Sequence, residues 1–143
     1  MKIVDLNVLL YTINRDAHHH LSALKWWERA LGDEEPIGLT WVVLNGFLRI
    51  STNPKFFPQS LSPDQAMAKV EAWLSHANTR VVLETERHWR ILKRLLETAG
   101  TAGNLTTDAH LAALAISYGA ALVSYDSDFS RFQELRWENP LNG

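Results

Sequence analysis

Residues 104–129, NLTTDAHLAALAISYGAALVSYDSDF, predict a helix, a tight turn, a buried strand and an acidic end, in that order. From Leu111 onward, apolar or aromatic residues recur at i, i+3, i+4 and i+7, which is the spacing of one helical face. A threonine, Thr106 or Thr107, is expected to cap the N-terminus of this helix. Gly119 is expected to end the helix in the left-handed conformation that C-terminal caps favour.

Three aspartates accompany these two elements. Asp108 falls in the first turn of the expected helix, and its neighbours at i+3, i+4 and i+7 are all apolar. We therefore expect its carboxylate to lie above the buried face of the helix. Asp126 and Asp128 follow the apolar run at 120–123, which suits a short buried strand. Carboxylates this close to a core require a physical explanation.

A fourth aspartate, Asp5, ends the apolar strand expected at the start of the chain, just before another predicted helix. In an open parallel sheet, ligands bind outside the carboxyl ends of the strands. If the two strands are parallel neighbours, Asp5 and Asp126 meet at that edge, and Asp108 can join them from the start of its helix. Carboxylates placed together raise each other's pKa, and a hard divalent cation removes that penalty. Oxygen ligands alone favour Mg²⁺ or Mn²⁺.

Predicted strands and helices alternate along all 143 residues, which indicates an α/β fold with a central, mainly parallel sheet flanked by helices. The length suits one domain, residues 1–143. Among the remaining elements we expect a helix at 18–31, a strand at 81–83, a helix at 86–98 and an edge strand at 135–138.

The amino-acid composition limits which partners and which cellular compartment the protein is expected to have. The formal net charge is −2, so any contact with RNA must come from a local basic patch. The absence of cysteine excludes disulfides and thiolate metal sites and is compatible with a reducing cytoplasm. Lys2 and an expected strand follow Met1 directly, so we expect no signal peptide, and no apolar stretch of the sequence is long enough to span a membrane. We therefore expect a cytoplasmic protein.

Three segments resemble the acidic motifs of PIN-domain ribonucleases, and most closely the VapC-type toxins of bacterial type II toxin–antitoxin pairs. They are VDLNVLLY at 4–11, LTTDAHLAALA at 105–115 and LVSYDSDF at 122–129. Each motif is weak alone, but their order and spacing in a chain of this length are specific, and the resemblance covers nearly the whole chain. It implies a single PIN-like domain that cleaves RNA.

The resemblance also implies a role for each acidic residue. Asp5, Asp108 and Asp126 would ligate one or two Mg²⁺ or Mn²⁺ ions, with Asp128 as an additional candidate ligand. The ion would lower the pKa of a bound water and stabilise the leaving oxygen. Asn7 and Ser124 are expected to orient the carboxylates by hydrogen bonds.

Arg49 is a candidate contact for a phosphate or for an inserted antitoxin, although a solvated helix arginine explains it equally well. Several other basic residues could add phosphate contacts, but each is more simply a surface cation: Lys55, Arg87, Arg90, Lys93 and Arg94.

One position departs from the family pattern. The segment WVVLNGFLRISTNPKFF at 41–57 resembles a further family segment, which usually carries a glutamate one residue before the position of Phe47. Here that residue is Gly46. Glycine inside a helix costs about 1 kcal/mol relative to alanine, so it calls for a reason such as close backbone approach or room for a ligand. The missing glutamate leaves open an alternative, a PIN-like module that binds RNA or a partner without efficient cleavage.

Simpler structural roles and rival enzyme classes compete with the metal site. Asp5 could simply cap a helix, and Asp126 could be a turn residue. A haloacid-dehalogenase-like phosphatase is disfavoured because Asn7 stands where that class has a second acid, and the acidic pair of a response-regulator receiver is absent. The histidine run at 18–20 is not a predicted metal site, because consecutive helical residues point in different directions.

The family resemblance also implies partners, namely an RNA substrate, a small cognate antitoxin and a second copy in a homodimer. The chain contains more large aromatic residues than so small a core is expected to bury. We expect some of the following to form an exposed apolar patch: Trp26, Trp41, Phe56, Phe57 and Trp73.

Overall fold

The computed structural model describes residues 1–142 and is built on a sheet of five strands in the order β3-β2-β1-β4-β5. Every neighbouring pair is parallel, so the prediction of an α/β fold with a mainly parallel sheet is confirmed. The strands are β1 (Lys2–Val4), β2 (Ile37–Leu39), β3 (Thr79–Val81), β4 (Ala121–Val123) and β5 (Arg136–Glu138).

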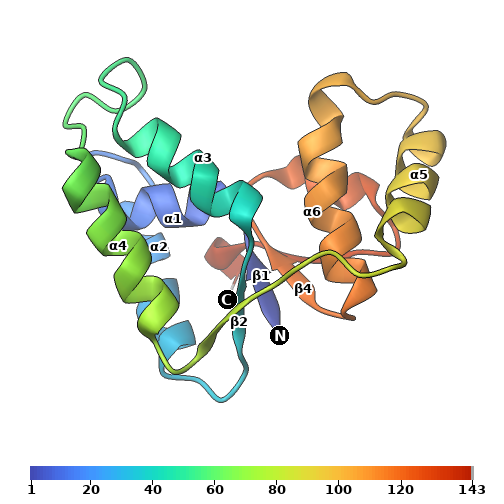
Figure 1. The fold of residues 1–143 in the computed structure, drawn as a ribbon, viewed down its shortest axis with the longest axis horizontal. Coiled ribbons are helices and arrows are strands. Elements are labelled where there is room, and N and C mark those ends of the chain that lie inside the picture. The colour runs from blue at the N-terminus through green and yellow to red at the C-terminus, as the bar shows by residue number, and fades with distance from the viewer. Residues whose placement is uncertain (143) are drawn as a thin grey trace.

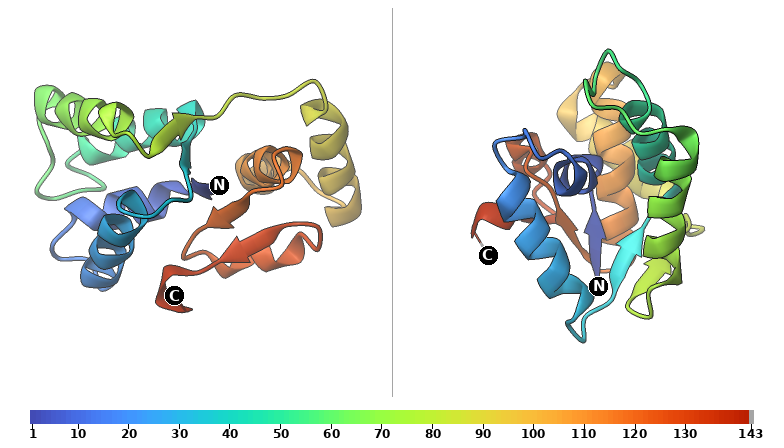
Figure 2. Two further views of the ribbon diagram at one scale, coloured as in Figure 1. Left: turned by 90° about the horizontal axis from the view of Figure 1, so that it is seen from below. Right: turned by 90° about the vertical axis from the view of Figure 1, so that its left-hand side faces the viewer.

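Two groups of helices flank the strands, with α1 to α4 on one side of β1 and α5 and α6 on the other (Figures 1 and 2). Short 3₁₀ helices lead into α6, follow β4 and end the described chain. The helices are α1 (Leu6–Ile13), α2 (His20–Leu31), α3 (Trp41–Ser51), α4 (Pro63–Ser75), α5 (His88–Ala99), α6 (Thr106–Ser117), η1 (Gly103–Leu105), η2 (Ser127–Arg131) and η3 (Pro140–Asn142).

Most residues of helix α6 are buried, because the helix packs against strand β4 of the sheet and against helix α5. The predicted threonine cap is wrong. Leu105 is the N-cap and has helical backbone angles, since η1 already turns the chain before Thr106. Gly119 has a φ of +61°, as predicted for the residue that ends the helix. Tyr118 is not part of the buried face but is 44% exposed, because the helix ends at Ser117.

The strand expected at 81–83 is wrong by two residues. Strand β3 pairs with β2 from Thr79 to Val81, and β2 itself ends at Leu39, opposite Val81. The apolar run at 81–83 therefore continues two residues beyond the paired part of β3. The helices expected at 18–31 and 86–98 each begin two residues later than predicted. The edge strand expected at 135–138 is β5.

The register of β1 and β4 places the acidic residues. Val4 is paired with Val123 in the parallel ladder, so the residues that follow them leave the sheet side by side. Asp5 and Ser124 are these residues, and the amide of Asp5 donates to the carbonyl of Val123 at 2.9 Å.

No helix within residues 1–142 is long and apolar enough to cross a membrane.

Candidate active site

Asp5 is fixed at the junction of β1 and α1. Its Oδ1 accepts a hydrogen bond from the amide of Leu6 at 2.7 Å, and its Oδ2 accepts one from the hydroxyl of Ser124 at 2.7 Å. The residue is 9% exposed, and burial raises the pKa of its carboxyl group. The two hydrogen bonds oppose that rise in pKa, and the negative charge of Asp126 adds to it. Asp5 is thus both a helix cap and a member of an acidic cluster.

Ser124 connects the residues around Asp5. While its hydroxyl donates to Asp5, the same oxygen accepts hydrogen bonds from Nδ2 of Asn7 at 3.1 Å and from the amide of Asp126 at 3.0 Å. Asn7 also accepts a bond from the amide of Tyr125 at 3.2 Å. Both residues that were expected to orient carboxylates therefore lie in one network with Asp5.

Asp126 and Asp128 lie in the turn after β4. Oδ1 of Asp126 accepts the amide of Asp128 at 2.9 Å and so caps the 3₁₀ helix η2. The side chain of Asp126 is half-buried, whereas Asp128 is exposed. The bond to Asp128 comes from its backbone, so the carboxylate of Asp128 remains available for other contacts.

Asp108 approaches the same place from the first turn of α6. Burial, followed by the charges of Asp5, Asp126 and Asp128, raises its pKa from 3.8 to about 6. The guanidinium of Arg131 acts in the opposite direction. Four carboxylates from distant parts of the chain therefore share one electrostatic environment.

The donor groups of this cluster are all carboxylate oxygens, which suit a hard divalent cation. As placed here, however, no three acidic, histidine or cysteine side chains within residues 1–142 form a ready-made ion site. The structure brings the expected residues into one neighbourhood without closing them around a single point.

Gly46 allows helix α3 to approach the start of α1. A Cβ atom added at this position would lie 2.8 Å from Cδ2 of Leu6, the residue next to Asp5. Two reasons could explain this glycine, namely close backbone approach and room for a ligand. The structure supports close approach, because the backbone of α3 lies against the side chain of Leu6. Gly46 is buried.

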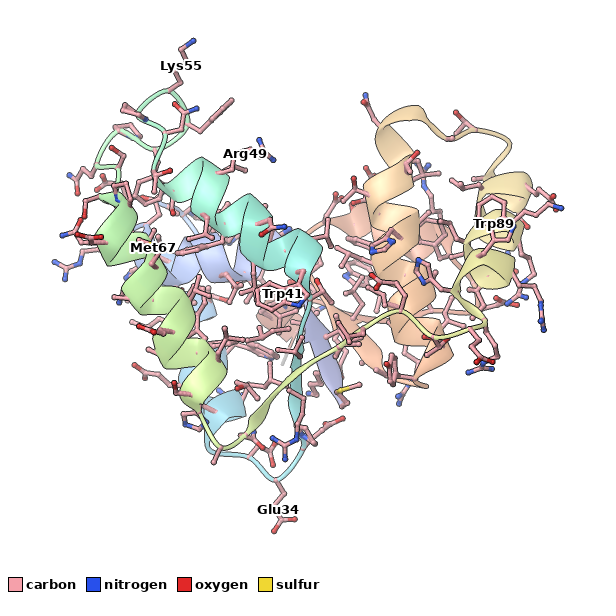
Figure 3. All side chains as sticks on the ribbon, in the orientation of Figure 1. Glu34, Trp41, Arg49, Lys55, Met67 and Trp89 are labelled. Atoms are coloured by element: carbon pink, nitrogen blue, oxygen red, sulfur yellow. The ribbon has the colours of Figure 1, made fainter. Side chains whose placement is uncertain are left out.

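Among the predicted basic residues, Arg49 is exposed and points from α3 toward the side of the molecule where α6 lies (Figure 3). Three others have partners away from the acids. Arg87 donates to the carbonyl of Ser117, while two form ion pairs, Lys93 with Glu97 and Arg94 with Glu134.

Arg131 was missed by the sequence interpretation, although it influences Asp108 directly. Its position three residues after Asp128, at the end of the acidic turn, is the signal that could have identified it.

The histidine run at 18–20 is partly packed. His18 is exposed, His19 stacks on Tyr125 with ring centroids 4.7 Å apart, and Nδ1 of His20 contacts the carbonyl of Tyr11 at 2.7 Å. The five aromatic residues that were candidates for an exposed apolar patch fall into two groups. Trp41 and Phe56 are 48% and 63% exposed, whereas the other three, Trp26, Phe57 and Trp73, are buried.

Comparison with known proteins identifies the family. The PIN domain model matches residues 2–135. The chain is 46% identical over 140 residues to ribonuclease VapC37 of Mycobacterium tuberculosis, which covers 98% of this chain and 97% of that protein. It is 41% identical over 141 residues to ribonuclease VapC33 of the same organism, with 99% of each chain covered.

Solved structures agree in fold. VapBC2 from Rickettsia felis, bound to a DNA fragment from its promoter, matches with a TM-score of 0.72 and 22% identity over 96% of this chain and 97% of that one. The Sarcin-Ricin loop cleaving toxin VapC20 of Mycobacterium tuberculosis matches with a TM-score of 0.65 and 19% identity over 91% and 93% of the two chains. On the family model and the curated relatives together, this chain belongs to the PIN domain family, among the VapC ribonucleases.

Proposed function

We propose that this protein is a divalent-metal-dependent endoribonuclease that hydrolyses phosphodiester bonds of RNA, as the toxin component of a toxin–antitoxin pair. The observation that carries the proposal is the electrostatic coupling of Asp108 to Asp5, Asp126 and Asp128. The 46% identity to a protein named a ribonuclease, over 98% of this chain, supports it.

The chemistry of the cluster fits a cation of charge +2. Its donors are hard oxygens, and burial together with mutual repulsion raises the pKa of Asp108 to about 6, which a bound cation would reverse. Mg²⁺ or Mn²⁺ suits such a site best, and when bound it supplies an activated water and stabilises charge on the leaving oxygen.

The chain's own residues have distinct roles in this proposal. Asp5 is a fixed ligand, because Leu6 and Ser124 hold both of its oxygens. Asp108 and Asp126 complete the ligand set, and Asp128 is an additional candidate. Ser124 and Asn7 orient these groups.

The alternative function, binding without efficient cleavage, rests on Gly46 in place of the usual glutamate. The contact between position 46 and Leu6 gives this glycine a packing role. Its presence therefore does not require an inactive site. An exposed carboxylate at Asp128 could supply the missing oxygen ligand.

The proposed partners are an RNA substrate, a cognate antitoxin and a second copy of the chain, acting in the cytoplasm. Trp41 and Phe56 supply exposed apolar surface for the protein partners. Arg49, exposed on α3, is a candidate contact for a phosphate or for the antitoxin. We further propose that one PIN-like domain spans residues 1–143.

The deciding experiment measures cleavage of a structured RNA by the purified chain with Mn²⁺, with Mg²⁺ and with EDTA. Cleavage should require the metal, and Asp126→Asn should lower it at least about a hundredfold, because metal-assisted charge stabilisation contributes several kcal/mol. Asp16→Asn, which changes an exposed acid outside the cluster, is the matched control. Metal-independent cleavage, or equal activity of the two variants, would contradict the proposed site.

A further inference from the structure

A cavity of about 490 Å³ lies between the second half of α5 and the segment that follows η2. Leu95, Ala99 and Phe132 give it an apolar side, and polar groups complete the lining, among them Arg94, Arg131 and Gln133. A volume of this order falls within the range of about 300–1,000 Å³ that is typical of small-molecule sites. The acids of the candidate active site do not line this cavity.

Arg131 connects this cavity to the acidic cluster. It is the last residue of η2, which begins directly after Asp126 and contains Asp128. Its charge also acts on the carboxyl group of Asp108. One short 3₁₀ helix thus carries acids of the candidate active site at its start and a wall of the cavity at its end.

We propose that the cavity binds one nucleotide of the RNA strand, beside the phosphate that is cleaved, and so contributes to the choice of cleavage sequence. This inference rests on the proposed ribonuclease function. The base would lie against the apolar side, and Gln133 offers both a donor and an acceptor to a base edge. The guanidinium of Arg131 has the planar geometry that suits a phosphate group.

The charges around the cavity favour an anion. Within residues 1–142, Arg131 forms no ion pair closer than 4 Å. Arg94 and Glu134, which both line the cavity, form an exposed ion pair with a 2.8 Å contact. Exposed pairs of this kind are weak, so a phosphate can replace Glu134 as the partner of Arg94. The cavity thus combines an apolar side with two cations, Arg94 and Arg131, against one carboxylate, Glu134, and this net positive lining suits a nucleotide.

Binding can be measured separately from cleavage. The Asp5→Asn protein is suited to this, because asparagine caps a helix as well as aspartate does while one metal ligand is weakened. Its affinity for a fluorescein-labelled single-stranded RNA of mixed sequence is measured by anisotropy at several salt concentrations. Two changes are then added separately. Thr98→Trp fills the cavity from an exposed lining position, and Arg131→Gln removes the cation.

Each change has a matched control on the other side of β1. Ala72→Trp adds the same side chain at an exposed position of α4, and Lys25→Gln removes an exposed cation of α2. Thr98→Trp should weaken binding about tenfold, the typical effect of losing one bound base. Arg131→Gln should weaken it similarly and lower the slope of log affinity against log salt by about 0.7, the value for one phosphate contact on a single strand. The controls should leave affinity and slope unchanged.

Equal affinities for the cavity variants and their controls, or no RNA binding at all, would overturn this inference. Failure of the proposed ribonuclease function gives a different result, namely binding that depends on Thr98 and Arg131 in a protein that never cleaves RNA. In the cleaving protein, Thr98→Trp should also change which sites of a mixed-sequence RNA are cut, whereas Ala72→Trp should not.

Discussion

The hydroxyl of Ser124 donates a 2.7 Å hydrogen bond to Oδ2 of Asp5, and it joins two residues that are 119 positions apart in the chain. The parallel pairing of Val4 with Val123 makes this contact a direct consequence of the sheet register. Because the same oxygen also accepts bonds from Nδ2 of Asn7 and the amide of Asp126, one small side chain links two of the four acidic residues.

Replacing Ser124 with alanine should destabilise the protein and weaken its metal binding. The change leaves a buried carboxyl oxygen of Asp5 without its partner, which typically costs about 1–3 kcal/mol. It also removes a bond that lowers the pKa of Asp5, so this pKa should rise further. Urea unfolding and Mn²⁺ titrations test both effects. Ser130→Ala, at an exposed position nearby, is the control and should leave both quantities unchanged.

Asp108 should make stability depend on pH in the absence of metal. Its pKa is about 6 in the folded protein and 3.8 in the reference state, so the folded state holds this proton more tightly. The resulting stability is fully present below about pH 3.8 and is lost as pH rises through about 6.

Asp108→Asn should therefore raise the free energy of unfolding at pH 7.5, by about 1 kcal/mol after allowance for solvent screening of a half-buried group. Near pH 4 the variant and the wild type should differ little. Melting temperatures in EDTA at the two pH values measure this, with Asp16→Asn as the exposed control. A lower melting temperature for Asp108→Asn at pH 7.5 would show that burial of this carboxylate, together with repulsion from the other acids, does not dominate its effect on stability.

Asp128 should matter for metal use if it replaces the glutamate that Gly46 lacks. Asp128→Asn keeps the backbone bond to Asp126, so the turn should remain intact. We expect this variant to need about tenfold more Mn²⁺ for half-maximal RNA cleavage, because one oxygen ligand is weakened. If Asp128→Asn cleaves normally while Asp126→Asn is inactive, Asp128 is a turn residue and the three-aspartate site acts alone.

Gly46 and Leu6 should be energetically coupled. An alanine Cβ at position 46 would lie 2.8 Å from Cδ2 of Leu6, which opposes the gain of about 1 kcal/mol that alanine otherwise gives a helix. Gly46→Ala should therefore be more favourable, by about 1 kcal/mol, when Leu6 is also alanine. Urea unfolding of the four proteins measures the coupling, and Asn45→Ala with Leu6→Ala should show none.

The same contact sets a condition on restoring the family's glutamate. In an Asp128→Asn protein, Gly46→Glu should restore cleavage better when combined with Leu6→Ala than by itself, because the glutamate then has room beside the cluster. RNA cleavage at low Mn²⁺ compares the two combinations. Equal rescue by both would show that Leu6 moves aside without appreciable cost.

The sequence by itself determined the fold class and was sufficient to single out the acidic residues of the candidate site. Apolar runs that end on Asp5 or shortly before Asp126 predict strands whose carboxyl ends carry charge, and the glycine at 119 predicts where α6 gives way to β4. These features depend on residues that are near one another in the chain, so local spacing is sufficient to find them.

Only the tertiary structure decided how the acids interact and which neighbours they have. The raised pKa of Asp108, the contact of Gly46 with Leu6 and the approach of Arg131 all depend on distances between separate elements. The same holds for Trp26 and Trp73, which are buried while Trp41 is exposed. Burial and charge interactions are set by packing in three dimensions, and residue spacing along the chain does not fix those distances.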